Sequence, residues 1–390
     1  MANLTASGFV FSRSLKKVSM AFPSAGVLDP KGGRLSLSLG DAPEFEGRFF
    51  PPVSLDVSEW ADAAAAPFPD FEPTGEPILR ADDVETIGLY GRTMVITAEY
   101  GGNVATAEAV VIPGGLSSDA FTRFSEAGKD IFTERFLNPA NNFFLTTRTA
   151  GWRIVIKETE LYPLYFIFDR PRILQVRELA TGASQMFRLG SDIFALDLAA
   201  LRRYFVIVDR VFPSMFDVYV DSNFSCRIVI EKARQVKNRY RLKYRSSFGV
   251  PEIVELTGDL TFSPSFESSD DFSYSAPSAF DGKLKNYRMR QPMSLKGSIS
   301  TGPKRADEIR MILDAVASPE AWLLDYAAHP VRVLLSLEST EIAARPEAPQ
   351  ELKLGFELQN EETNISPDIS DPAAGRKPRV FSKQFNKVFN

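Results

Sequence analysis

The chain has 390 residues, of which 44% are hydrophobic and 24% charged, and its formal net charge is −5 at pH 7. This length allows two or three domains that each bury a core, and the acidic balance argues against a general nucleic-acid binder. One histidine and one cysteine exclude zinc sites built from several such residues and any internal disulfide. We therefore expect no catalytic residues, no cofactor and no metal, and predict that the protein is not an enzyme.

Residues 1–158 are expected to form an N-terminal β-rich domain. Leu35–Leu39 alternates apolar and polar residues, which is typical of a half-buried strand. Residues 43–77 carry seven prolines and are predicted to be an extended connection, because proline breaks both helices and strand ladders. This segment is either a surface loop or an arm whose aromatic side chains dock on a neighbouring subunit.

The rest of this domain is predicted to contain strands and one helix. The expected strands are Glu85–Tyr90, Thr93–Tyr100, Val104–Ile112, Asn142–Thr147 and Trp152–Lys157. Glycine-containing hairpin turns separate the first three of them. The helix is expected over Ser117–Phe136, because apolar residues recur there on one face and serine or aspartate can cap its start.

Residues 159–237 are predicted to form an immunoglobulin-like β-sandwich, from the even spacing of short strands and turn residues. The first three strands, expected to form a meander, are Leu161–Phe168, Arg172–Leu179 and Ser184–Leu189. The remaining elements are a short helix at Ala195–Arg203 and strands at Phe205–Val208, Met215–Val220 and Ser225–Glu231. Cys226 lies among strand residues and is expected to be a buried, unreactive thiol.

Residues 238–360 are predicted to form a third, β-rich domain with one helix over residues 303–317. Its expected strands are Tyr240–Tyr244, Ile253–Phe262, Lys285–Met289, Met293–Ser300, Ala321–Tyr326, Val331–Leu337 and Glu351–Leu358. The basic and aromatic run Arg234–Arg245 could face nucleic acid, but alternation along a strand places its charges on one outer face. We favour an intersubunit surface there.

Residues 361–390 are predicted to be a C-terminal basic and aromatic arm. Arg376–Asn390 holds five basic residues and no acidic one, and its phenylalanines recur every four residues, which gives one stripe on a helix. Such a segment is either a frayed end or an arm that orders on binding a partner, and the acidic remainder makes another copy the expected partner. The expected interaction residues are Arg376, Lys377, Arg379, Phe381, Lys383, Phe385, Lys387 and Phe389.

Signals for enzymatic chemistry are weak. The chain has no GxxxxGK[ST] loop, no GxSxG and no GxGxxG after a strand. The acidic pairs Asp82-Asp83, Asp270-Asp271 and Glu361-Glu362 could serve a glycosidase, but they lie in loop-like segments where solvated charge is normal. His329 precedes Pro330 at the entry to a strand and is predicted to be a turn or surface histidine.

The sequence contains no apolar run that suggests membrane targeting. Met1–Phe22 lacks an apolar stretch of signal-peptide length, and no later run approaches the roughly 20 apolar residues that cross a membrane. We therefore expect no membrane association.

The stretch from Asn238 to Gly258 has a distinctive order. A strand that ends in a basic residue is followed by Ser246-Ser247-Phe248-Gly249-Val250-Pro251-Glu252 and then by a β run ending in Thr257-Gly258. This stretch and the elements after it resemble tail and baseplate-type virion proteins of phages and prophages, over about residues 160–360. The resemblance implies a modular β protein that oligomerises around a tail or neck, and it transfers no catalytic residue.

The predicted fold class is mainly β and multidomain, with immunoglobulin-like or β-sandwich domains, a few short helices and extended terminal arms. The leading hypothesis is a structural component of a phage tail, neck or baseplate. It would self-assemble as a six- or twelve-fold ring, dock other virion tail proteins, and reside in the virion after synthesis in the host bacterial cytoplasm. The alternative is a carbohydrate-binding or receptor-binding adhesive module, with surface aromatics such as Trp60, Trp152 or Trp322 in a shallow groove.

Overall fold

The chain folds into two compact units, residues 1–261 with 297–357 (unit 1) and residues 262–296 with 358–390 (unit 2). The computed structural model describes residues 3–4, 8–16, 18–21, 32–50, 53–71, 76–89, 91–210, 212–266, 273–288, 293–325, 330–338 and 348–358. Strands dominate and the helices are short, which confirms the predicted mainly β, multidomain class. The domain boundaries at 158/159, 237/238 and 360/361 stay predictions.

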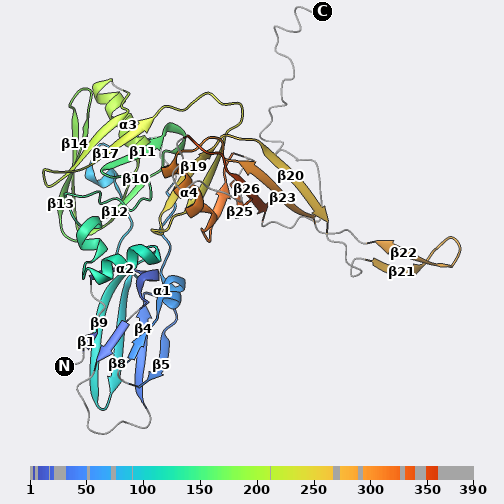
Figure 1. Cartoon of the computed structure of the whole chain (residues 1–390), viewed down its shortest axis with the longest axis horizontal. Helices are drawn as coiled ribbons and strands as arrows, with labels where there is room; N and C mark the ends of the chain where they lie inside the picture. Colours follow the sequence, from blue (N-terminus) through green and yellow to red (C-terminus); the bar gives the residue numbers. More distant parts are fainter. Residues whose placement is uncertain are drawn as a thin grey trace, which may run out of the picture. The chain divides into compact units, whose positions relative to one another are not determined.

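A five-stranded sheet forms the first part of unit 1 (Figure 1). Its spatial order is β2 (Gly8–Phe11), β9 (Asn103–Ile112), β8 (Thr93–Tyr100), β4 (Gly33–Leu39) and β5 (Phe45–Phe49). A smaller sheet contains β1 (Asn3–Leu4), β3 (Val18–Ala21) and β6 (Val53–Leu55). Leu35, Leu37 and Leu39 of β4 are buried at alternate positions, as the sequence predicts.

The prediction that residues 43–77 are extended throughout is wrong. β5, β6 and helix α1 (Ser58–Ala64) lie within this segment. β5 fits between prolines and pairs with β4, and α1 occupies a proline-free stretch rich in alanine, the best helix former. Several aromatic side chains of the segment pack on their own chain, because Phe68 is buried and Trp60 and Phe71 lie against the adjacent cores. Phe45 and Phe50 are exposed.

The helix predicted over Ser117–Phe136 is broken in two. α2 spans Ser118–Glu126, and the Ser117 hydroxyl caps it by accepting a hydrogen bond from the Ala120 amide at 3.2 Å. Gly128 then adopts φ +65°, a left-handed conformation that ends helices, before a π-helical turn at Phe132–Phe136. The predicted strand at Asn142–Thr147 is instead a loop, which makes a backbone hydrogen bond from Leu145 to the Tyr165 carbonyl but no ladder.

Two sheets pack across a shared core in the middle of unit 1. The six-stranded sheet has the order β10 (Thr149–Ala150), β11 (Arg153–Lys157), β17 (Asn223–Glu231), β16 (Met215–Val220), β13 (Arg172–Glu178) and β14 (Ser184–Leu189). The three-stranded sheet has the order β12 (Leu164–Phe168), β15 (Asp192–Leu196) and β7 (Glu85–Thr86). A sandwich of two sheets therefore surrounds the core.

The strand pairing differs from the predicted meander. β12 pairs with β15 in the smaller sheet, whereas β13 lies between β14 and β16 in the larger one. All five β12 side chains are buried, so this strand lies inside the sandwich rather than at the start of a half-exposed meander. β11 pairs with β17 in parallel, so one neighbour pair departs from the antiparallel pattern of immunoglobulin sheets.

A single helix replaces the helix and strand predicted after residue 195. α3 spans Leu198–Asp209 and is capped by Asp197, whose carboxylate accepts hydrogen bonds from the Ala199 and Ala200 amides. Apolar residues at 205–208 continue this helix, because no glycine or proline interrupts it before Arg210. Phe205 faces the core, whereas Ile207 and Val208 are exposed.

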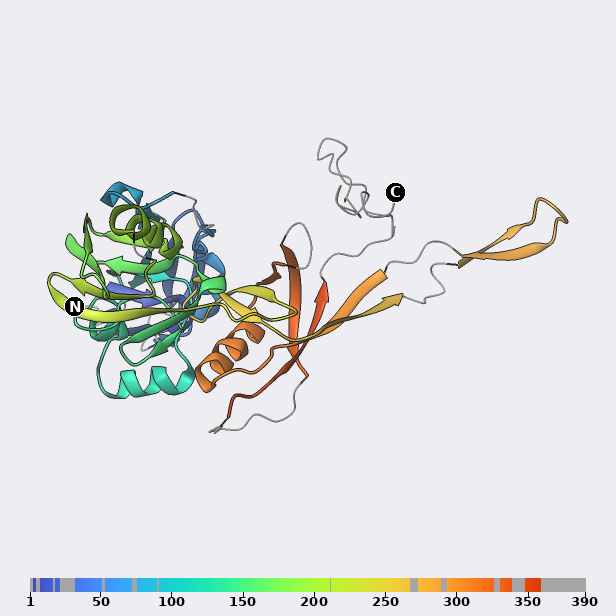
Figure 2. The same ribbon diagram turned by 90° about the horizontal axis from the view of Figure 1, so that it is seen from above.

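A seven-stranded sheet is built from strands between residues 240 and 358. Its order is β19 (Pro251–Leu256), β18 (Tyr240–Arg245), β24 (Ala321–Leu323), β25 (Val331–Leu337), β26 (Lys353–Leu358), β23 (Met293–Ser300) and β20 (Leu260–Phe266). Helix α4 (Ala306–Val316) packs beside β25 (Figure 2). The strand predicted over Ile253–Phe262 breaks near Gly258, where a Cβ would lie 2.3 Å from the Cβ of Ser300.

The described core of unit 2 is a hairpin of β21 (Ser273–Pro277) and β22 (Leu284–Arg288). Five residue pairs align in antiparallel register, and the turn is closed by the Ser278 amide, which donates to the Lys283 carbonyl at 2.8 Å. Within the described part of the chain, no helix is long and apolar enough to cross a membrane.

The turn at residues 246–249 connects β18 with β19 in the seven-stranded sheet and packs against the end of the five-stranded sheet. Its Phe248 ring lies 5.7 Å from that of Phe11 and 5.3 Å from that of Phe136. Gly249 has φ +75°, and a Cβ there would lie 2.2 Å from the carbonyl oxygen of Pro113. Only glycine fits this close backbone approach, so the turn that carries the sequence resemblance holds two parts of unit 1 together.

We predict that Gly249→Ala lowers the free energy of unfolding by about 2–4 kcal/mol, because left-handed strain adds to a backbone collision. Gly91→Ala is the matched control, since Gly91 has φ +73° and no atom within 4 Å of an added Cβ. The control should lose only about 1–2 kcal/mol in urea unfolding. Equal losses in the two variants would show that the close approach at Gly249 is unimportant.

Candidate functional site

The predicted interaction residues Arg376, Lys377, Arg379, Phe381, Lys383, Phe385, Lys387 and Phe389 lie outside the described residues. His329, Asp270-Asp271 and Glu361-Glu362 lie outside them as well. Their roles stay predictions.

Two other candidates have structural roles. Asp83 closes a turn, because its carboxylate accepts hydrogen bonds from the Leu79 and Arg80 amides at 2.8 Å each. Cys226 is fully buried, and burial raises the pKa of its thiol to about 12. The prediction that Cys226 is buried is confirmed, and the raised pKa disfavours the thiolate, which is the nucleophilic form. The described residues contain no group of three or more acidic, histidine or cysteine side chains placed to hold a metal ion.

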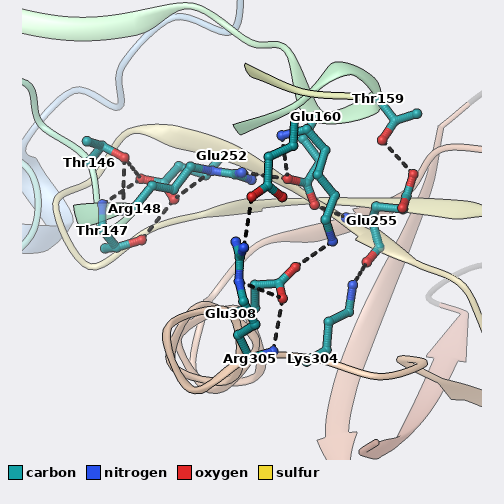
Figure 3. Close-up of polar contacts among 12 residues, drawn as sticks. Thr146, Thr147, Arg148, Thr159, Glu160, Glu252, Glu255, Lys304, Arg305 and Glu308 are labelled. Atoms are coloured by element: carbon teal, nitrogen blue, oxygen red, sulfur yellow. Dashed lines mark hydrogen bonds and ion pairs between the residues drawn. The ribbon is translucent and has the colours of Figure 1, made fainter. Parts of the chain in front are cut away.

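A buried ionic network lies between the six-stranded and seven-stranded sheets (Figure 3). Arg148 donates to Glu160 at 2.7 Å, and both side chains are almost fully buried. Glu160 also accepts the Glu255 amide of β19 at 2.7 Å. Burial alone would raise the pKa of Glu160, but the charges of Arg148 and Lys157 outweigh it and lower that pKa.

Glu252 is the second buried carboxylate of the network. It accepts hydrogen bonds from the Thr146 hydroxyl at 2.9 Å and from the Thr147 amide and hydroxyl at 2.8 Å each. The Tyr244 hydroxyl donates to it from β18 at 3.3 Å. Burial is the largest effect on Glu252 and raises the pKa of its carboxyl, although Arg148 and Thr147 act in the opposite direction.

Lysine side chains extend the network to α4 and the segment before it. Lys157 at the end of β11 forms an ion pair with Glu308 of α4. Lys304 donates to the backbone carbonyl of Glu255, and Arg239 pairs with the Glu255 carboxylate at 2.8 Å. Lys304 is 1% exposed, and burial lowers the pKa of its ammonium to about 8. Four separate chain segments are therefore tied together by charge-assisted hydrogen bonds.

The network has no room for a substrate. The cavity lined by Arg148, Lys157, Glu160 and Glu308 has a volume of about 20 Å³, enough for a single water molecule. We conclude that these groups position the two sheets. The sequence contained a signal for them, since Glu252 and Glu255 interrupt an otherwise apolar strand in which all six residues are buried.

The hairpin of unit 2 presents apolar side chains to solvent. Phe280 in its turn is 100% exposed, and Leu284 and Tyr274 are 74% and 52% exposed. Among the described strands, β21 and β22 pair only with each other (Figure 1). Apolar side chains exposed on such a small element would stabilise it if another surface covered them.

A second exposed surface lies beside strands β11, β16 and β17. Trp152 is 45% exposed and meets Phe224 edge-on, with ring centroids 5.9 Å apart. The guanidinium groups of Arg153 and Arg227 lie 4.9 and 5.1 Å from the centre of the Trp152 ring. Tryptophan and arginine are the residues most enriched in the energetic centres of interfaces.

Comparisons with known proteins identify no family. No family model matches the sequence, and no curated protein is similar to it. Among solved structures, a chain of "Tail of empty GTA particle computed with helical refinement, C6 symmetry" is similar to 33% of this chain and to 96% of its own length. The sequence identity is 16% and the TM-score is 0.23.

The lowered pKa of Lys304 implies that the free energy of unfolding depends on pH in the alkaline range. The folded chain releases this proton near pH 8, whereas the ordinary value is 10.5, so unfolding takes up a proton between these limits. The contribution of Lys304 to the free energy of unfolding should therefore rise with pH over this window, by about 3 kcal/mol at most.

Denaturant unfolding of wild type and Lys304→Met from pH 7 to 10.5 measures this contribution. The difference in unfolding free energy between them should change in favour of wild type as the pH rises. Lys129→Met is the control, because Lys129 is about half exposed and should show no such trend. A pH-independent difference for Lys304→Met would contradict the account of its burial.

Proposed function

We propose that the protein is a non-catalytic structural component of a phage tail, neck or baseplate. It self-assembles into a six- or twelve-fold ring and docks neighbouring virion proteins. The observation that carries this proposal is the β21–β22 hairpin, two strands that pair only with each other in the described chain and expose Phe280 completely.

The hairpin is physically incomplete as an isolated element. A two-stranded hairpin is marginally stable in water, and three strands or a covering surface are needed for independent stability. Burying a leucine or phenylalanine side chain contributes about 1.5–3 kcal/mol, so covering Phe280 and Leu284 would stabilise both the hairpin and the complex. In a self-assembled oligomer, a second copy of the chain can cover these two side chains. A head-to-tail contact that repeats by rotation closes a ring.

Charge supports the same proposal. The predicted arm at residues 361–390 carries the five basic residues of Arg376–Asn390, and the chain before Arg376 holds 40 basic and 50 acidic residues. Opposite charges on two parts of one chain favour association between copies and raise its rate. The resemblance of about residues 160–360 to tail and baseplate-type proteins supports placement in a virion.

Replacing the exposed apolar residues of the hairpin tests the proposal. We expect wild type to sediment as a closed oligomer, and Phe280→Ser with Leu284→Ser to shift it towards monomer without lowering the melting temperature of unit 1. Val104→Ser is the matched control, since Val104 is 62% exposed in a different hairpin and should leave assembly unchanged. Deleting residues 376–390 should also weaken the oligomer, more at low salt than at high salt, because an electrostatic contact is screened. A monomer in all samples would refute the proposed function.

The Trp152 surface favours one alternative, an adhesive module that binds carbohydrate or a receptor. Its exposed indole, next to Phe224, provides the aromatic surface that such a module needs. The alternative predicts a monomer or trimer that binds glycans on an array and loses this binding in Trp152→Ala. The structural role predicts that Trp152→Ala leaves ring formation intact.

A further inference from the structure

A pocket beside α2 and the turn at residues 246–249 contains an arginine without an acidic partner. The pocket has a volume of about 690 Å³. Arg135 donates to the backbone carbonyls of Asn142 and Thr146 at 3.2 Å each, and it lies 4.7 Å from the Phe136 ring centre. Among the described residues, no carboxylate forms an ion pair with it: Glu134, which also lines the pocket, pairs with Lys129 at 3.5 Å, and the buried Glu252 acts on Arg135 only through its charge.

A second group in this pocket also lacks a partner. The side chain of Asn142 is 7% exposed, and its Oδ1 accepts the Phe144 amide at 3.3 Å. This bond fixes the orientation of the amide, so Nδ2 is the free end, and it has no hydrogen-bond partner in the described structure. A buried donor without an acceptor is costly, and an anion that binds both Asn142 and Arg135 would remove that cost.

The other walls of the pocket are mixed, because Ser117, Thr149, Ser247 and the ion pair of Lys129 with Glu134 lie beside apolar side chains. Leu116, Phe124, Ile131 and Phe248 line it, and each is only half-buried, so part of each side chain is open. Burial lowers the pKa of Arg135 to about 10, against a smaller opposing effect of the Glu252 charge. The pocket therefore suits a ligand that combines a carboxylate with an aromatic or branched apolar group.

The tip of the hairpin has this combination. Phe280 is fully exposed and Asp281 follows it, and hydrogen bonds within residues 278–283 order the turn. Asp281 lies 3.4 Å from Lys285, a contact between two exposed side chains that contributes little. Its carboxylate can exchange this partner for the more buried Arg135 of another chain.

We propose that the hairpin tip of one copy inserts into the Arg135 pocket of the next copy, with Asp281 bound by Arg135 and Asn142, and Phe280 against Phe124 and Phe248. This inference rests on the proposed self-assembly and names its contact. The hairpin and the pocket are different surfaces, so the contact is head-to-tail and can propagate around a ring.

A double-mutant cycle on the full-length protein tests the contact. Asp281→Asn keeps the shape of the exposed tip, and Arg135→Gln removes the positive charge of the pocket. Each should weaken self-association measured by sedimentation about 10- to 100-fold, the range for one charged hydrogen-bonded contact, and the double variant should be no weaker than either single variant. Asp82→Asn makes the same chemical change at an exposed turn and should have no effect.

The outcomes separate this inference from the proposed function. If wild type assembles and Asp281→Asn behaves like Asp82→Asn, or if the two losses multiply, the contact is wrong and the structural role stands. If wild type is monomeric at every concentration, both are wrong. If Arg135→Gln does not fold, Asp281→Asn still tests the contact, because this variant alone must weaken assembly. In a mixture of the two single variants, the intact hairpin of Arg135→Gln can bind the intact pocket of Asp281→Asn. Only this one interface forms per pair, so the mixture should yield dimers.

Discussion

The carboxylate of Glu252 is the point on which the architecture of unit 1 depends. It binds Thr146 and Thr147 of the loop before β10 and Tyr244 of β18, while Arg148 joins it to Glu160. Removing one partner from such a buried network leaves a charge without its counter-charge and lowers the free energy of unfolding by about 3–5 kcal/mol. The stability that each group provides therefore depends on the others. The adjacent turn at Gly249 adds a close backbone contact. Charge and shape thus fix how the sheets meet, and the outer surfaces remain for partners.

Unit 1 and the hairpin differ in the burial of their apolar side chains. Unit 1 encloses continuous apolar cores, in which phenylalanine rings such as Phe143 and Phe144 are fully buried. The hairpin exposes Phe280 and Leu284 and, among the described strands, forms a sheet of only two. An element of this kind is stable when another chain completes it. The proposed assembly role follows from this contrast, and the pocket at Arg135 offers the complementary surface.

Local signals predicted the elements, and long-range contacts limited that prediction. Alternation at Leu35–Leu39 and the Gly101-Gly102 turn located strands correctly because both act between near neighbours. The hairpin predicted between Glu85–Tyr90 and Thr93–Tyr100 is wrong, because β7 pairs with β15 in another sheet. Residues 205–208 were misassigned because Val and Ile suit strands, yet packing of Phe205 on the sandwich core keeps them helical. The ionic network escaped prediction because Arg148, Glu252 and Lys304 are far apart in sequence. The charged residues in β19 were the one visible sign, since buried strands rarely carry two glutamates.

Amide hydrogen exchange of the full-length protein over a range of concentrations tests the central claim, that another copy completes the hairpin. Amides of residues 273–288 should exchange fast in dilute solution and become protected as the oligomer forms. Amides of β8 and β9, paired within unit 1, should be equally protected throughout. Fast exchange of the hairpin at every concentration, in a sample that is demonstrably oligomeric, would contradict the account.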